Sequence, residues 1–73
     1  MSRYIFRADK MIARCEADPE KAKLLDAETV RFIHAIDGEE GTDYNWQNVV
    51  NGEPIVYLIK SQVPVAIVDC DPA

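Results

Sequence analysis

The pair Asn51-Gly52 lies between two apolar stretches and constrains the fold of this chain more than any other feature. A two-residue turn of type I′ needs positive φ at both central positions, and Asn-Gly adopts that conformation at low steric cost. We therefore predict that residues 46–50 and 53–59 pair as an antiparallel hairpin. The substitution Gly52→Val should disrupt the hairpin, because a β-branched residue is strained at positive φ.

A third strand is expected after this hairpin. Residues 60–62 form a short polar break, and residues 63–68 are again apolar, which completes an antiparallel meander. Pro64 has no N–H to donate to a neighbouring strand. The third strand should therefore lie at an edge of the sheet, or Pro64 should be its first residue.

Both faces of the middle strand are apolar. Ile55, Tyr57 and Ile59 share one face, and Val56 and Leu58 share the other. An antiparallel sheet with one wet face would instead alternate apolar and polar residues. We expect helices of this chain to cover one face. The other face needs a partner, such as a second copy, or a wrapping segment.

The N-terminal segment allows two interpretations. In residues 1–15, apolar residues recur with the spacing of an amphipathic helix, for which Ser2 is a candidate N-cap. Alternatively, residues 3–7 form a short strand, because Tyr-Ile-Phe favours β structure, and this strand pairs with the meander as a fourth strand. The helix would align four cations in one basic stripe: Arg3, Arg7, Lys10 and Arg14.

Helix signals return in the middle of the chain. Asp18 can cap a helix whose first position is Pro19, and the apolar pattern continues toward Ile36. Asp26 can also cap, so either one kinked helix or two short helices fit the sequence. Gly38 suits the left-handed conformation that often ends a helix.

Together these elements predict an α+β fold with one or two helices on a three-stranded antiparallel meander, and an N-terminal fourth strand as the alternative. With 73 residues, the chain should form one small domain over residues 1–73 with a marginal core, which favours a homodimer. The sequence has neither a signal-peptide pattern nor the roughly 20 apolar residues of a membrane span. We expect a cytoplasmic protein that does not contact membranes.

Charge is unevenly distributed along the sequence. The net charge is −5, but the residues up to His34 carry seven Lys or Arg and six Asp or Glu. From Ala35 onward the sequence has one basic residue, Lys60, and seven Asp or Glu residues. Such asymmetry often accompanies a charged interaction surface. We therefore expect the acidic half, rather than the basic stripe, to make the main functional contact.

One loop combines acids with aromatic residues. Aromatic side chains flanked by polar groups are typical anchors of protein interfaces. This loop therefore supplies the predicted partner-binding residues, which are Glu39, Glu40, Asp43, Tyr44 and Trp46. The partner they suit is a protein with a basic surface.

Signals for catalysis, cofactors and metals are weak. His34 is the only histidine, and the sequence has no Gly-rich phosphate loop. A calcium loop that began at Asp37 would need Glu at its twelfth position, where Asn48 stands. Cys15 and Cys70 have no CxxC spacing, so we expect reduced thiols. We expect no enzymatic activity, no cofactor and no metal site.

The sequence therefore predicts a small acidic binding module that inhibits or modulates a larger protein, such as one that handles nucleic acid. Acidic single domains of this size without cofactors are common among inhibitors from phages and mobile elements, including anti-CRISPR proteins and DNA mimics. That association rests on size and charge alone. One alternative is a small dimeric DNA-binding regulator that uses the basic N-terminal helix, although direct nucleic-acid binding is not our expectation. A structural or assembly subunit is the other alternative.

Overall fold

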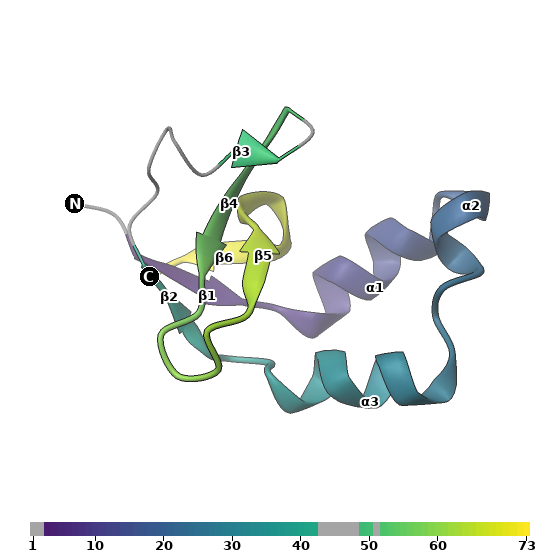
Figure 1. Cartoon of the computed structure of the whole chain (residues 1–73), viewed down its shortest axis with the longest axis horizontal. Helices are drawn as coiled ribbons and strands as arrows, with labels where there is room; N and C mark the ends of the chain where they lie inside the picture. Colours follow the sequence, from purple (N-terminus) through teal and green to yellow (C-terminus); the bar gives the residue numbers. More distant parts are fainter. Residues whose placement is uncertain (1–2, 43–48, 51) are drawn as a thin grey trace.

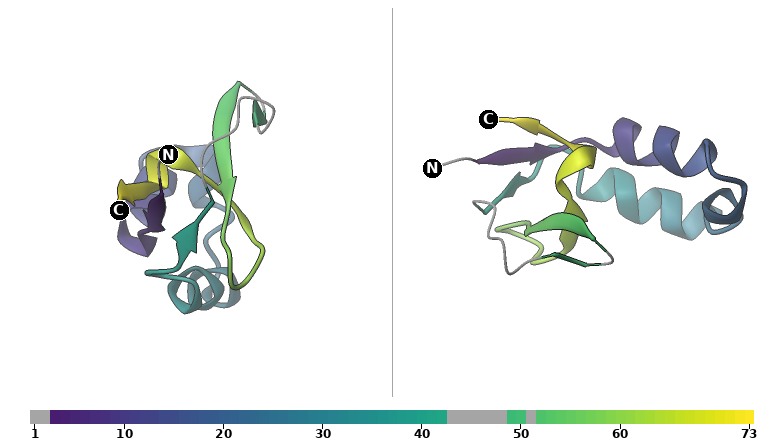
Figure 2. Two further views of the ribbon diagram at one scale, coloured as in Figure 1. Left: turned by 90° about the vertical axis from the view of Figure 1, so that its left-hand side faces the viewer. Right: turned by 90° about the horizontal axis from the view of Figure 1, so that it is seen from above.

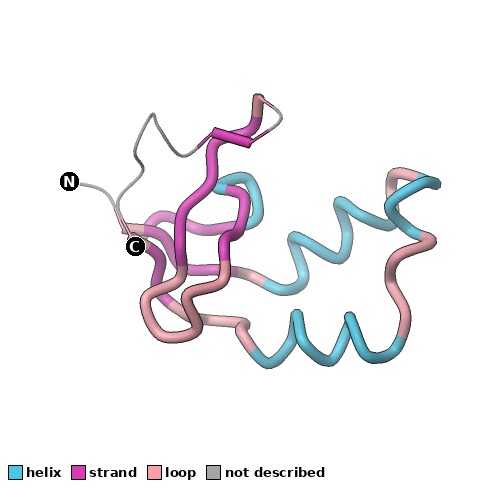
Figure 3. Tube along the Cα trace, viewed as in Figure 1, coloured by secondary structure: helices cyan, strands magenta, loops and turns pink. Residues whose placement is uncertain are grey.

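Helices and strands occupy opposite ends of the molecule (Figure 1, Figure 3). The computed structural model describes residues 3–42, 49–50 and 52–73. Its helices are α1 (Ala8–Glu16), α2 (Pro19–Ala22) and α3 (Ala27–Ala35). Its strands are β1 (Tyr4–Phe6), β2 (Glu40–Gly41), β3 (Val49–Val50), β4 (Glu53–Tyr57), β5 (Pro64–Ala66) and β6 (Cys70–Pro72), and a 3-10 turn, η1 (Ile67–Asp69), precedes β6. The α+β class is confirmed.

The predicted meander is present as an antiparallel sheet in the order β3-β4-β5. Val50 lies opposite Glu53 across the hairpin, and Gly52 has the positive φ that the turn requires, at 76°. Pro64 is the first residue of β5, and β5 is an edge strand of this sheet. Asn51 and the predicted strand residues 46–48 lie outside the described residues.

The predicted third strand over residues 63–68 is too long. Strand pairing ends at Ala66, and η1 then turns the chain away from the meander. Val68 is consequently 53% exposed instead of packed on a sheet face. The turn leads into β6, a strand for which the sequence carries no local signal.

The helix predicted over residues 1–15 is wrong in its first half. Tyr4–Phe6 is strand β1, which pairs antiparallel with β2 on one side and β6 on the other, so the strand alternative is confirmed. The expected partner was wrong, because β1 lies in a second sheet and not in the meander. Ladder hydrogen bonds to two distant segments outweigh the local helical pattern. In Figure 2, β1 and β6 lie side by side.

The first turn of α1 is capped by a distant side chain. The Ala8 N–H donates to Asp37 Oδ1 at 2.7 Å, whereas Arg7, at the N-cap position, makes no side-chain capping bond. Because α1 begins at Ala8, Ser2 cannot cap it. Asp37 thereby joins the start of α1 to the segment that follows α3.

The middle of the chain forms two short helices, which decides between the two interpretations. Asp18 accepts a hydrogen bond from Glu20 N–H, and Asp26 accepts one from Thr29 N–H, so both predicted caps are confirmed. Gly38 has φ of 85°, but it lies two residues beyond the C-cap residue Ile36.

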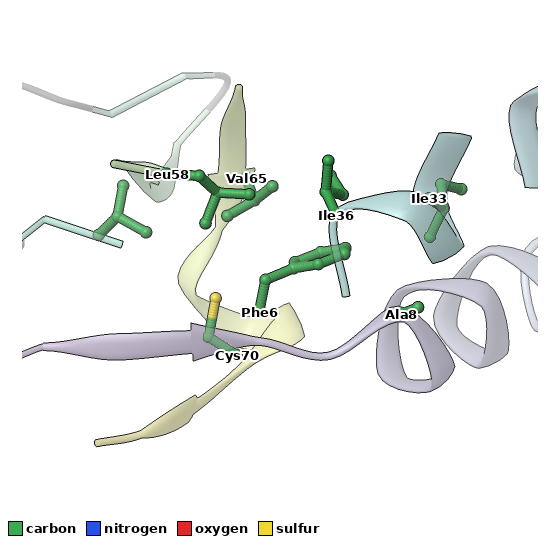
Figure 4. Close-up of a cluster of buried hydrophobic side chains, with 8 residues drawn as sticks. Phe6, Ala8, Ile33, Ile36, Leu58, Val65 and Cys70 are labelled. Carbon is green, nitrogen blue, oxygen red and sulfur yellow. The ribbon is translucent and has the colours of Figure 1, made fainter. Parts of the chain in front are cut away.

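The core lies between the two sheets and the helices (Figure 4). Phe6 is fully buried and shares the core with Ile36 and with Val56 and Leu58 of the meander's inner face. That inner face is thus covered by β1 as well as by the helices. The two sheets are joined through β2, because Gly41 lies opposite Tyr4 in one sheet and bridges to Leu58, which directly follows β4 of the other.

Candidate interaction surface

Two of the five predicted partner-binding residues lie in the part of the chain that the structure describes. Glu39 precedes β2, and its Oε1 accepts a hydrogen bond from the Ser61 N–H at 2.9 Å. Glu40 is in β2, and its Oε1 lies 3.3 Å from Arg3 Nη1. The other three, Asp43, Tyr44 and Trp46, lie outside the described residues.

Both glutamates line an open hollow of about 430 Å³ at the end of α3. Asp37 adds a third carboxylate, and the opposite wall is formed by Ile59 and Lys60 in the turn after β4. The β2 backbone holds these walls together, since the Ile59 N–H donates to Glu40 C=O at 2.9 Å. The hollow therefore combines negative charge with one exposed apolar side chain.

The outer face of the meander continues from this hollow. Tyr57 is 43% exposed and Ile59 is 50% exposed. A second open hollow of about 490 Å³ lies beside them, and Ile59 lines both hollows. We call this continuous region, formed by Glu39, Glu40, Tyr57, Ile59 and Lys60, the outer surface. It is the face for which the apolar alternation of the sequence predicted a partner.

Sequence reasoning found the acids and the apolar face separately but not their contact. Glu39 and Glu40 are joined to Ile59 by the bridge between Gly41 and Leu58, which are far apart in the sequence. No local pattern signals such a pairing. Lys60, which belongs to the predicted polar break, was also missed as a surface residue.

The basic stripe does not exist as one helical face, because Arg3 precedes β1 and Arg7 lies at the N-cap of α1. Instead, the cations pair with acids of the C-terminal half. Arg7 Nη1 lies 3.0 Å from Asp71 Oδ2, and Lys10 Nζ also binds Asp71. The hydrogen bond from Lys10, together with the charge of Arg7, lowers the pKa of the Asp71 carboxyl.

Arg14 makes the most buried of these ion pairs. Its Nε and Nη2 donate to the two oxygens of Asp69 at 2.9 and 2.8 Å, and the Asp69 side chain is only 2% exposed. Glu53 lies 3.3 Å from Arg14 Nη1. These contacts raise the pKa of Arg14, chiefly through the hydrogen bonds to Asp69. Arg3, Arg7, Lys10 and Arg14 are therefore paired with acids of the C-terminal half, and the net negative charge of the chain remains.

The two thiols are separate and free. Cys70 is buried, and its burial raises its pKa to about 11, so the unreactive thiol form prevails at neutral pH. Cys15 is half-buried on α1. Among the described residues, no group of three His, Cys, Asp or Glu side chains is arranged to hold a metal ion.

Comparisons with protein-family models, with curated proteins and with solved structures found no match to this chain. In the part of the chain that the structure describes, no helix has the length and apolar character needed to cross a bilayer.

Proposed function

We propose that this chain is a small non-enzymatic binding module that inhibits or modulates a larger protein, and that the outer surface makes the contact. The partner is a protein with a basic surface, such as one that handles nucleic acid. The proposal includes a cytoplasmic location, as expected from the sequence.

The observation that carries the proposal is the continuity of exposed apolar side chains with carboxylates on one open face. Burying a large apolar side chain is worth roughly 1.5–3 kcal/mol, so Tyr57 and Ile59 can anchor a partner. Glu39 and Glu40 lie at the rim, where negative charge accelerates encounter with a basic surface, and a cation of the partner would have to displace Arg3 to pair with Glu40.

The alternative of a DNA-binding regulator has less support. Binding to DNA would require the N-terminal cations to neutralise phosphates. Arg7, Lys10 and Arg14 are instead paired with carboxylates of the same chain. A nucleic acid would have to displace these internal pairs before it could use the cations.

A second copy of the chain is the other occupant that this surface suits. Exposed Ile59 and Lys60 lie beside carboxylates, so two such surfaces related by a two-fold axis offer each other apolar and opposite-charge contacts. We therefore include a homodimer through the outer surface in the proposal.

The proposal is tested by affinity capture from the native host with variant baits. Ile59→Glu places a charge in the centre of the outer surface, whereas Val68→Glu places one at a similarly exposed apolar site on η1. The wild-type chain and the Val68 variant should capture the same partner, and the Ile59 variant should lose it. Equal capture by the Ile59 variant, with native circular dichroism, would refute the assigned surface.

The electrostatic part of the proposal is tested with the captured partner. Glu39→Gln with Glu40→Gln removes two charges but keeps an acceptor oxygen for Ser61 N–H. Glu16→Gln with Glu28→Gln removes two charges from exposed positions on the helices. Only the first pair should slow association, by roughly threefold to tenfold at low salt, and flatten its salt dependence. Equal effects would mean that net charge alone matters.

A further inference from the structure

A separate hollow of about 300 Å³ is lined by residues of α1, α2, α3 and the segment between α2 and α3. These helices form the end of the molecule opposite the sheets (Figure 1). Its walls are mainly apolar side chains, which are Met11, Cys15, Leu24, Leu25 and Ile33, and Thr29 adds a hydroxyl group. We call it the helical hollow. Its volume is at the lower end of the range for small-molecule sites, which runs from about 300 to 1,000 Å³.

Two cations, Arg14 and Lys21, complete the lining. The Arg14 guanidinium is already bound by Asp69 and Glu53. Lys21 makes no ion pair within the described part of the chain, and it is exposed on α2. The helical hollow therefore offers an apolar interior with one uncommitted ammonium group at its edge.

We propose that the helical hollow binds a small apolar carboxylate, such as a medium-chain fatty acid. The hydrocarbon chain lies among Met11, Leu25 and Ile33, where it removes apolar surface from water. The carboxylate accepts hydrogen bonds from the Lys21 ammonium. This inference is independent of the proposed function, because the outer surface is formed by other residues at the other end of the molecule.

Leu24 gives the site a means of covering its ligand. This side chain belongs to the segment between α2 and α3, lines the helical hollow, and is 69% exposed. Much of its apolar surface therefore faces water. A bound hydrocarbon chain would cover that surface, so Leu24 should become protected when the ligand binds.

The test is a titration of the intact chain with octanoate, followed by nuclear magnetic resonance of the Met11 methyl and the Leu24 methyls. We expect saturable shifts with a dissociation constant on the order of 1 mM, as suits so small a ligand. Octan-1-ol should bind more weakly, and octylamine should bind least. No saturable shift, or equal affinity for octylamine, would overturn the proposal.

Substitutions at Lys21 and Cys15 test separately what the Lys21 charge and the volume of the helical hollow contribute to binding. Lys21→Gln should weaken octanoate binding by about threefold to fivefold, as expected for an exposed ion pair, and leave octan-1-ol binding unchanged. Lys23→Gln is the matched control, because Lys23 is paired with Glu20 and does not line the hollow. Cys15→Leu fills the hollow and should abolish binding of both ligands without loss of thermal stability. If Lys21→Gln and Lys23→Gln change octanoate affinity equally, Lys21 does not bind the carboxylate.

A second copy is the competing occupant of the helical hollow. If an apolar side chain of another copy occupies it, octanoate will dissociate an oligomer seen by sedimentation, and Cys15→Leu will dissociate it as well. That pair of results would overturn the small-molecule assignment. An unchanged sedimentation profile during saturable binding supports it.

Discussion

At the scale of single residues, Gly41 has no room for a side chain. It is buried in β2, where the two sheets meet, and faces Tyr4 in one sheet and Leu58 in the other. A Cβ atom built on Gly41 would lie 2.8 Å from Cγ2 of Val56, a fully buried core side chain. Glycine is therefore required at position 41 because Val56 lies so close to it, and not because the backbone has an unusual φ.

Gly41→Ala should lower the free energy of unfolding by about 1–3 kcal/mol, because a packed core accommodates an extra methyl group poorly. Urea denaturation measures the loss, with sulfate in every sample so that weak variants stay folded. In the background of Val56→Ala the same substitution should cost less, since the clashing atom is gone. Equal costs in both backgrounds would contradict the steric explanation.

Gly52→Val is the matched control for this experiment. Gly52 has positive φ, and a Cβ atom at this position would have nothing within 4 Å, so its replacement introduces only backbone strain, of about 1–3 kcal/mol. That strain should be the same with Val56 or with Ala at position 56. The role of Gly52 could be predicted from the sequence, because Asn51 precedes it. The role of Gly41 could not, because the side chain that crowds it belongs to a strand far away in the sequence.

At the scale of elements, the C-terminal segment is bound to the N-terminal one. The β6 strand pairs with β1, Asp69 in η1 binds Arg14 of α1, and the Arg7 N–H donates to Asp69 C=O at 2.9 Å. Asp71 binds Arg7 and Lys10 nearby. Two aspartates two residues apart thus hold the same junction, one of them buried and the other 38% exposed.

Asp69→Asn should be far more destabilising than Asp71→Asn. The first change leaves the Arg14 charge without its bidentate partner in a buried setting, at a cost of about 2–4 kcal/mol, which is reduced because Arg14 is itself 34% exposed. Asp71→Asn removes an exposed carboxylate, and water can solvate Arg7 and Lys10 in its place. Urea denaturation of the two variants measures the difference. Similar losses would show that burial does not determine the strength of this junction.

Elements with local signals were predicted well, and those defined by distant contacts were not. Asp18, Asp26 and the Asn51-Gly52 pair act on their own neighbours, so the helix starts and the hairpin could be predicted. Tyr4–Phe6 is a strand only because residues 40–41 and 70–72 pair with it. The same limit applies to the candidate site, since Glu39 and Ile59 meet through a long-range bridge.

At the scale of the whole molecule, the two apolar surfaces lie at opposite ends. The outer surface exposes Tyr57 and Ile59, and the helical hollow is edged by exposed Leu24. The molecule is elongated, with extents of 35 × 25 × 17 Å, so both ends are accessible at once. The two proposed sites could therefore be occupied at the same time.

We expect the wild-type chain to self-associate through the outer surface at high micromolar concentration, because exposed Tyr57 and Ile59 gain from burial. Sedimentation equilibrium measures the mass. Ile59→Glu should give a monomer, whereas Val68→Glu should behave like the wild type. If the wild-type chain is a monomer at those concentrations, self-association through the outer surface is refuted, and a different protein is then the only proposed partner of that surface.

The pairing of β1 with β6 has a consequence for biosynthesis. Phe6 leaves the ribosome more than 60 residues before Cys70–Pro72, the strand that completes its sheet. During translation Phe6 therefore has no finished core to enter, and its apolar surface stays accessible to chaperones. The helices and the hairpin can form early from local contacts, but the sheet that contains β1 can close only when β6 has been synthesised. Folding of this domain should thus be completed only after β6 has left the ribosome.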